Sequence, residues 1–174
     1  MKKCIPALIA VFCLSGCLTG IPGELQAVKN FDIDRYAGTW YELYRLDHPF
    51  ERGLSHVTAT YTRQEDGSVK VENEGMKGDG SMSFIEGRAE FQGDTSVGSL
   101  KVSFFGPFFS GYHIIALDEE NYDYAMIAGG NFNYLWILSR TPQLDEAIVD
   151  RLLMQAEESG YVLDELIMVD QTQE

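Results

Sequence analysis

Apolar and polar residues alternate along most of the chain from residue 37 to residue 140, and this period of two limits the possible folds more than any other feature. In SVKVEN (68–73), Val69 and Val71 alternate with polar residues, and HVTATYT (56–62), FIEGRAEF (84–91) and SLKVSF (99–104) repeat the pattern. Side chains of a strand point alternately to opposite faces, so each segment is typical of a strand with one buried and one solvated face.

Turn signals separate these segments at regular intervals. EDGS (65–68) contains an Asp-Gly hairpin signal, and GDTS (93–96) and GGNFN (129–133) are further turns. The predicted strands are 37–47, 56–64, 68–74, 82–92, 98–105, 111–118, 122–129 and 133–140. Short strands at regular spacing predict an all-β sandwich or barrel, and an eight-stranded antiparallel up-and-down barrel has room for side chains or one small ligand.

The period becomes helical after SRTP (139–142). The apolar stripe that indicates one C-terminal helix outside the barrel consists of Ile148, Val149, Leu152, Leu153 and Ala156. We expect Thr141 to cap this helix, Pro142 to lie in its first turn and Gly160 to end it. A last short strand is predicted at 166–170.

Composition and motifs exclude several functions. The net charge of −14, from 27 acidic and 13 basic residues, argues against nucleic-acid binding, which needs clustered Lys and Arg. His48, His56 and His113 form no metal-binding pair, and we expect them at the surface or the rim. No Ser nucleophile elbow and no phosphate-binding glycine loop occurs, so we expect no catalysis, no metal and no cofactor.

The N-terminal residues have the pattern of an export signal. Lys2 and Lys3 precede the apolar run CIPALIAVFCL (4–14), which is short for a membrane span. LSGC (14–17) then resembles the lipobox of bacterial lipoproteins, in which cleavage precedes the Cys and the Cys is lipidated. This resemblance implies a signal peptide at 1–16, lipidation of Cys17 and, because Leu18 is not the Asp of inner-membrane retention, the outer membrane. An ordinary secretory signal is the alternative.

Three motifs resemble those of the lipocalin family. Gly38-Thr39-Trp40 matches the G-x-W motif of the first strand, Tyr122-Asp123-Tyr124 takes the place of the T-D-Y motif, and Arg140 matches the basic residue that ends the eighth strand. FERGLSHVTATY (50–61), LKVSFFGPFFSGYHIIALD (100–118) and YLWILSRTP (134–142) are similar to the bacterial outer-membrane lipocalins. The family implies that Gly38, Trp40, Asp123 and Arg140 are structural, with Arg140 stacked on Trp40 at the closed end of the barrel.

This resemblance also implies a function and a domain plan. Such a protein binds fatty acids or lysophospholipids, serves membrane maintenance, faces the periplasm from the outer membrane and in some cases forms homodimers. The expected parts are the signal peptide 1–16, the lipidated Cys with a flexible tether at 17–30, and the lipocalin domain at 31–174. An alternative is a lipid-anchored scaffold whose barrel is filled and whose surface binds a protein partner.

Parity along the meander separates the two ends of the barrel. Loops 48–55, 75–81, 106–110 and 130–132 should lie at the open mouth, opposite Trp40. FFGPFF (104–109) therefore belongs to the mouth, where its rings can contact a ligand or a bilayer, pack beneath their own loop, or form a dimer contact.

The same alternation predicts the cavity wall. The expected ligand-binding residues are Glu42, Tyr44, Val57, Ala59, Tyr61, Val71, Ile85, Ala89, Val102, Phe104, Tyr112, Tyr134, Trp136 and Leu138. An apolar wall with a few polar groups is typical of a ligand cavity. Because a buried carboxylate needs partners, Glu42 should meet Arg140 or a tyrosine, or else a ligand head group.

Overall fold

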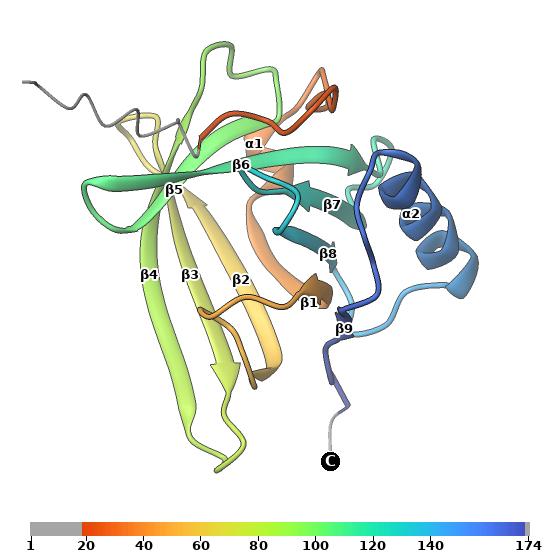
Figure 1. Cartoon of the computed structure of the whole chain (residues 1–174). Coiled ribbons are helices and arrows are strands. Elements are labelled where there is room, and N and C mark those ends of the chain that lie inside the picture. The colour runs from red at the N-terminus through yellow and green to blue at the C-terminus, as the bar shows by residue number, and fades with distance from the viewer. Residues whose placement is uncertain (1–18, 173–174) are drawn as a thin grey trace, which may run out of the picture.

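Eight antiparallel strands close into a barrel in the computed structural model, which describes residues 19–172 (Figure 1). The strands are β1 (Gly38–Leu46), β2 (Ser55–Arg63), β3 (Val69–Met76), β4 (Met82–Phe91), β5 (Ser99–Phe105), β6 (Phe108–Leu117), β7 (Tyr124–Ala128) and β8 (Leu135–Ser139). Neighbours in sequence pair in turn, and β1 pairs with both β8 and β2. The predicted architecture is confirmed, with strand ends shifted by a few residues.

A ninth strand closes a seam between β1 and β2. These two strands pair only from Gly38 to Tyr41 of β1, after which β9 (Leu166–Met168) pairs with β1 from Tyr44 to Leu46. The amide of Gln171 donates to the carbonyls of Glu42 on β1 and Val57 on β2, at 2.9 and 2.8 Å. The C-terminal segment therefore fills the part of the wall where the first two strands separate.

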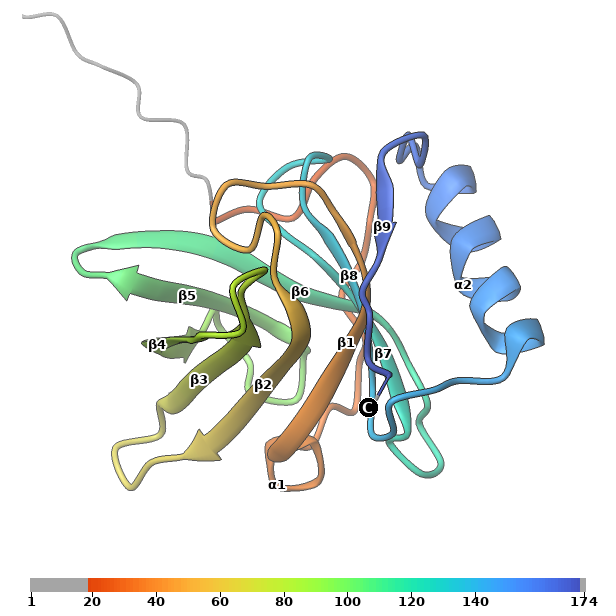
Figure 2. The same cartoon turned by 90° about the horizontal axis from the view of Figure 1, so that it is seen from below.

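The helix α2 (Glu146–Glu158) packs on the outside of the barrel, beside β7 and β8 (Figures 1 and 2). Its buried residues Val149, Leu152 and Ala156 belong to the predicted stripe. The expected cap at Thr141 is wrong: the carboxylate of Asp145 caps the helix by accepting from the N–H of Ala147 at 2.8 Å. The Thr141 hydroxyl instead donates to the Gln143 carbonyl, which holds the connecting loop.

A four-residue helix, α1 (Ile33–Tyr36), precedes the barrel and was not predicted. Asp32 caps it by accepting from the N–H of Asp34. Such a short helix has too little apolar periodicity to be recognised in a sequence. It carries Tyr36, which is buried, across the closed end.

Residues 19–30 are packed on the barrel, so the prediction of a flexible tether is wrong for this stretch. The N–H of Val28 donates to the Ile114 carbonyl, and its carbonyl accepts from Gly98, both at 2.8–2.9 Å. Ile21 and Leu25 are partly buried and pack with the apolar cluster between α2 and the barrel. Figure 1 shows this segment, in red and orange, lying along β6.

The predicted signal peptide and the predicted lipidation site Cys17 fall in residues 1–18, outside the described part of the chain. Within residues 19–172, no helix has the length and apolar character needed to cross a membrane.

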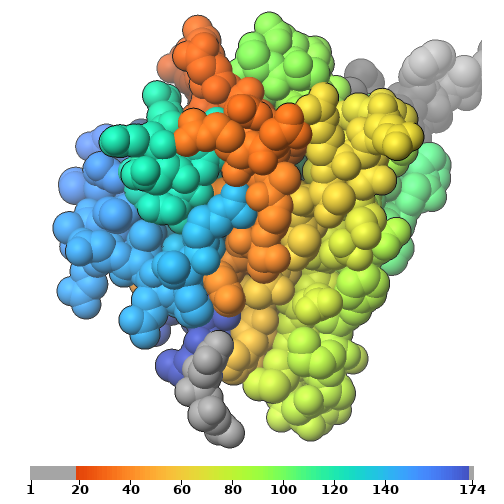
Figure 3. Space-filling view, turned by 180° about the vertical axis from the view of Figure 1, so that it is seen from behind, coloured from red at the N-terminus to blue at the C-terminus, as the bar shows by residue number. Residues whose placement is uncertain are grey.

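Seen from behind, the outer side chains of β1 to β4 form one wall beside those of α2 (Figure 3).

Candidate ligand cavity

A cavity of about 440 Å³ occupies the barrel interior. Its wall is mainly apolar and is open between the loops that follow β1, β3, β5 and β7. Every expected cavity residue except Tyr44 lines it: Glu42, Val57, Ala59, Tyr61, Val71, Ile85, Ala89, Val102, Phe104, Tyr112, Tyr134, Trp136 and Leu138. Its size lies in the range of small-molecule sites.

Tyr44 points away from the cavity because β1 contains a bulge. Glu42 pairs with Leu138 of β8 and Tyr44 with Ile137, so Leu43 is an extra residue that shifts the register. An extra residue reverses the alternation of the residues that follow it. Tyr44 consequently packs with the cluster beneath α2, while Arg45 turns inward.

Trp40 seals the closed end. Its ring is fully buried, and its indole N–H donates to the Tyr36 carbonyl at 2.8 Å. The Arg140 guanidinium lies 3.9 Å above the ring and also donates to the carbonyls of Arg35, Tyr36, Ala37 and Thr39. Gly38 has a positive φ of 99°, and a Cβ there would lie 3.4 Å from this guanidinium. The expected stacking of Arg140 on Trp40 is therefore present.

The last motif residue, Asp123, acts through its backbone. Its carbonyl accepts from the N–H of Arg140 at 2.8 Å, and its own N–H donates to the Asp118 carboxylate. These contacts hold the turn before β7 against the end of β8.

Three tyrosine hydroxyls meet above Trp40. The Tyr112 oxygen lies 2.6 Å from that of Tyr36 and 2.8 Å from that of Tyr61. Burial raises the pKa of all three well above the ordinary value, so they are neutral. These hydroxyls form a polar cluster at the inner end of an otherwise apolar cavity.

A second polar group lies on the mouth side and is built on the β1 bulge. Arg45 donates to the Glu42 carboxyl at 2.7 Å and to the carbonyls of Glu51 and Leu54. Glu42 thus meets Arg45, and the expected contact with Arg140 is wrong because the bulge, invisible in the sequence pattern, brings Arg45 inside. Burial, followed by the charge of Glu51, raises the pKa of Glu42 well above its ordinary value.

Glu51 completes this polar group. Its carboxylate lies 2.9 Å from His48 Nε2 and accepts from the indole N–H of Trp136 at 3.1 Å. Burial alone would raise the pKa of Glu51, but the hydrogen bond and charge of His48 and the Trp136 donor outweigh it and hold this pKa below its ordinary value. The pKa values of the two carboxyls are therefore shifted in opposite directions, upward for Glu42 and downward for Glu51.

Two histidines differ from the prediction of a surface or rim position. His48 is in a mouth loop but is 3% exposed, and His113 is 1% exposed. His113 points outward from β6 and is covered by the segment 19–30, so its burial depends on the docking of a segment that the pattern did not predict. The third, His56, is half-buried, and its ring contacts the Thr172 carbonyl.

FFGPFF divides between the inside and the outside of the barrel. Phe104 lies in the cavity against Gly87, where a Cβ would come within 2.6 Å of the ring. Phe109 lies under the Lys101 ammonium at 4.5 Å. Phe105 and Phe108 are 61% and 78% exposed at the mouth.

Sequence reasoning missed this polar group: His48 and Glu51 line the cavity, and Arg45 lies behind the wall, bonded to Glu42. HPFE (48–51) places a His and a Glu in a predicted mouth loop, and this spacing was the available signal. No Lys or Arg lines the cavity among residues 19–172, and this part of the chain holds no cluster of His, Cys, Asp and Glu suited to a metal ion.

Comparison with known proteins agrees with this geometry. A family model described as a lipocalin-like domain matches residues 31–171. Insecticyanin from the tobacco hornworm Manduca sexta has a similar fold, with a TM-score of 0.71 and 22% identity over 89% of this chain and 88% of that one. The chain belongs to the lipocalin family.

Within the family, bacterial relatives are similar along almost the whole chain. The outer membrane lipoprotein Blc of Citrobacter freundii is 46% identical over 96% of this chain and 95% of its own length. The protein of the same name from Escherichia coli K12 is 44% identical over the same shares. Temperature-induced lipocalin-1 of Arabidopsis thaliana is 35% identical over 82% of this chain and 81% of its own.

Proposed function

We propose that this protein is a lipid-anchored outer-membrane lipocalin that binds fatty acids or lysophospholipids and stores or carries them for membrane maintenance. The observation that supports it most is the open apolar cavity of about 440 Å³. Each CH₂ that leaves water for such a cavity contributes about 0.8 kcal/mol. Binding by partition needs no reaction, so the protein acts without catalysis.

The anchor is part of the same proposal. Residues 1–16 form the signal peptide, and Cys17 carries the lipid that holds the protein on the periplasmic side of the outer membrane. The lipobox LSGC supports this, as do the relatives named outer membrane lipoproteins. Two or three acyl chains on one Cys give firm attachment, at about 0.8 kcal/mol per buried CH₂.

The charges of the wall favour one orientation of the ligand. Its ionisable side chains besides the tyrosines are Glu42, His48, Glu51 and Glu74, and Arg45 behind the wall is bonded to Glu42, so an anionic head group meets no Lys or Arg among the lining residues. Desolvating an unpaired charge is costly. The acyl chain therefore enters towards the tyrosine hydroxyls, and the head group stays in water at the mouth.

The test uses the chain from residue 17 with Cys17→Ser, which keeps the whole described fold of residues 19–172. After delipidation, lysophospholipid and palmitate are titrated, with tryptophan fluorescence and calorimetry as readouts. We expect saturable binding at micromolar or tighter affinity. The fluorescence change should vanish in Trp136→Phe, which leaves only Trp40 at the closed end.

A variant with a larger side chain in the cavity tests whether the ligand binds there. Ala89 lies on the cavity wall and is 3% exposed, so Ala89→Phe should reduce affinity at least about tenfold by occupying the path of the chain. Ala147→Phe on the exposed face of α2 is the matched control and should bind as the parent does. Absence of binding by both methods in the parent would contradict the proposal and favour a scaffold for a protein partner.

A further inference from the structure

The start of the described chain lies on the mouth half of β6. The Thr19 carbonyl accepts from the Gln92 amide at 2.8 Å, and it lies 3.1 Å from where a Cβ of Gly111 would be. Gly111 is three residues from Phe108, which is roughly 10 Å along a strand. Cys17 is two residues before Thr19, and two residues span at most about 7 Å. The chain therefore limits the distance between the lipid attachment point and the β5–β6 hairpin to at most about the sum of these two spans.

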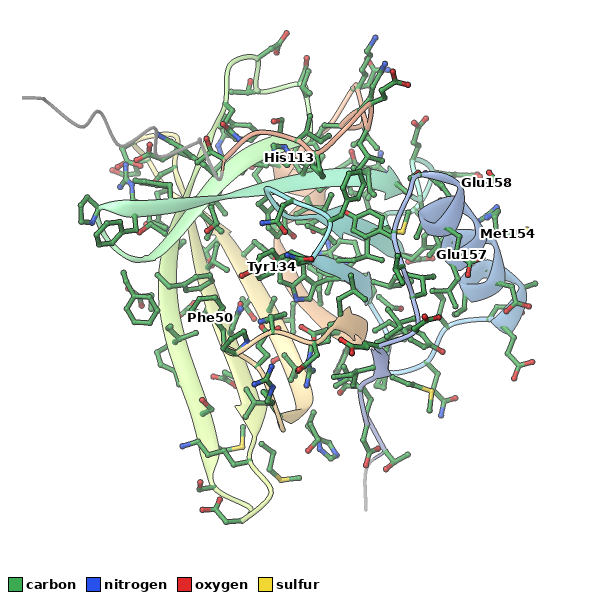
Figure 4. The ribbon with its side chains drawn as sticks, viewed as in Figure 1. Phe50, His113, Tyr134, Met154, Glu157 and Glu158 are labelled. Atoms are coloured by element: carbon green, nitrogen blue, oxygen red, sulfur yellow. The ribbon has the colours of Figure 1, made fainter. Side chains whose placement is uncertain are left out.

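The same end of the barrel carries exposed apolar side chains from three separate connections. Phe50 belongs to the loop after β1, Met82 and Phe84 to the mouth end of β4, and Phe105 and Phe108 to the β5–β6 hairpin. Their exposed fractions are 68, 60, 58, 61 and 78% in that order. Figure 4 shows Phe50 at this end and Met154 of α2 on the far side of the molecule. We call these five residues the apolar rim.

We propose that the apolar rim rests in the bilayer that holds the Cys17 anchor, so that the mouth opens directly onto that leaflet. The proposal rests on the lipidation of Cys17 that is part of the proposed function. The bilayer is the expected partner of the apolar rim because the docked segment 19–30 leads from the barrel to Cys17 on the rim side. Since this segment is held on the barrel, no long tether remains that would let the barrel turn over. An acyl chain could then pass between leaflet and cavity without crossing water.

The three cysteines of the chain all lie in its first 17 residues, so an engineered cysteine is the only free thiol of the lipidated protein. Phe108→Cys carries a nitroxide label at the rim. Glu119→Cys, in the exposed loop at the closed end, and Met154→Cys, on the exposed face of α2, are the matched controls. Each lipoprotein is reconstituted in vesicles of phosphatidylethanolamine with a minor fraction of phosphatidylglycerol.

The relaxation of the nitroxide label by oxygen, which concentrates in lipid, is compared with its relaxation by a water-soluble nickel chelate. We expect the label at 108 to favour oxygen at least about fivefold more than the labels at 119 and 154, since only the rim is immersed. Equal nickel access at the three positions overturns the inference. So does dipolar broadening between labels at 108 of two chains, which would indicate a mouth-to-mouth dimer.

A second measurement removes the apolar surface. The Phe105→Ser/Phe108→Ser variant of the anchor-free chain should partition onto the same vesicles at least about tenfold more weakly than its parent, because two exposed rings no longer enter the interface. Met154→Ser/Val162→Ser removes two exposed apolar residues elsewhere and should not change partition. Equal loss in both variants, or in neither, overturns the inference.

The measurements distinguish failure of the proposed function from failure of the proposed orientation alone. Absence of acyl mass on Cys17 overturns the anchor and this inference together. Saturable lipid binding by the soluble chain combined with a water-exposed label at 108 overturns the orientation alone.

Discussion

Arg140 joins five backbone carbonyls to one indole ring at the closed end of the barrel. The guanidinium is planar and has five donors, which lets one side chain hold the turn around α1 and stack on Trp40 together. Lysine offers a single ammonium and cannot do both.

We expect Arg140→Ala to lower the free energy of unfolding by about 2–4 kcal/mol, the sum of a cation–π contact and charged hydrogen bonds. Arg140→Lys should recover less than half of this loss. Urea titration monitored by Trp40 fluorescence measures both. A lysine variant as stable as the parent would show that charge alone suffices.

Glu42 gives the stability a pH dependence. Folding raises the pKa of this carboxyl above its ordinary value of 4.5, so its contribution is complete below that pH and is lost as the pH rises through the raised pKa. Glu42→Gln keeps an acceptor for Arg45 and cannot ionise. Its urea midpoint should fall less than that of the parent between pH 5, about half a unit above the ordinary pKa, and pH 8, which is well above it. Parallel curves would contradict this assignment.

At the level of single residues, alternation placed all but one of the expected residues correctly on the cavity wall, because inward and outward positions follow directly from the pleat. It failed after Leu43, where a bulge adds one residue and exchanges the roles of Tyr44 and Arg45. No residue type marks that bulge in the sequence. The polar group formed by Glu42, Arg45, His48 and Glu51 could therefore not be assembled in advance.

Among the elements, the short C-terminal segment connects the two strands that separate, β1 and β2. Gln171 supplies hydrogen bonds to both sides of the seam between β1 and β2, and the Asp170 carbonyl accepts from the N–H of His56 at 2.7 Å. Without this segment, the backbone groups of two separated strands would lack partners on the mouth half.

Gln171→Ala should lower the free energy of unfolding by about 1–3 kcal/mol, because two carbonyls lose their donor. It should also speed hydrogen exchange near Val57 more than on β6. Gln143→Ala, in the exposed loop before α2, is the matched control and should change stability by less than about 0.5 kcal/mol. Hydrogen exchange by mass spectrometry measures both, and uniform change across the barrel would argue against a local seam.

The sequence predicted the elements that have a clear local period. It did not predict the position of segments that depends on contacts with residues distant in sequence. The eight strands and α2 have clear periods, and the last strand was expected at 166–170 and found at Leu166–Met168. Residues 19–30 have no period, and their position depends on contacts with Ile114, Gly98 and Gln92, which are distant in sequence. Such pairings cannot be read from local pattern.

For the whole molecule, the cavity makes a quantitative prediction about its ligand. Affinity of the Cys17→Ser chain for lysophospholipids should rise with acyl length by up to about fourfold per CH₂, because each methylene contributes about 0.8 kcal/mol. The rise should stop once the cavity of about 440 Å³ is full. Calorimetry with a series of chain lengths provides the measurement, and affinity that ignores chain length would place the ligand outside the barrel.

The seam between β1 and β2 also bears on how the chain is made. Its closure uses residues 166–172, which follow all other elements of the described chain and therefore leave the ribosome after them. The barrel can assemble its other strand pairs early but closes its side only once this segment has been made. A purification tag is accordingly better placed away from residues 166–172, because a fusion there would hinder the segment that completes the wall.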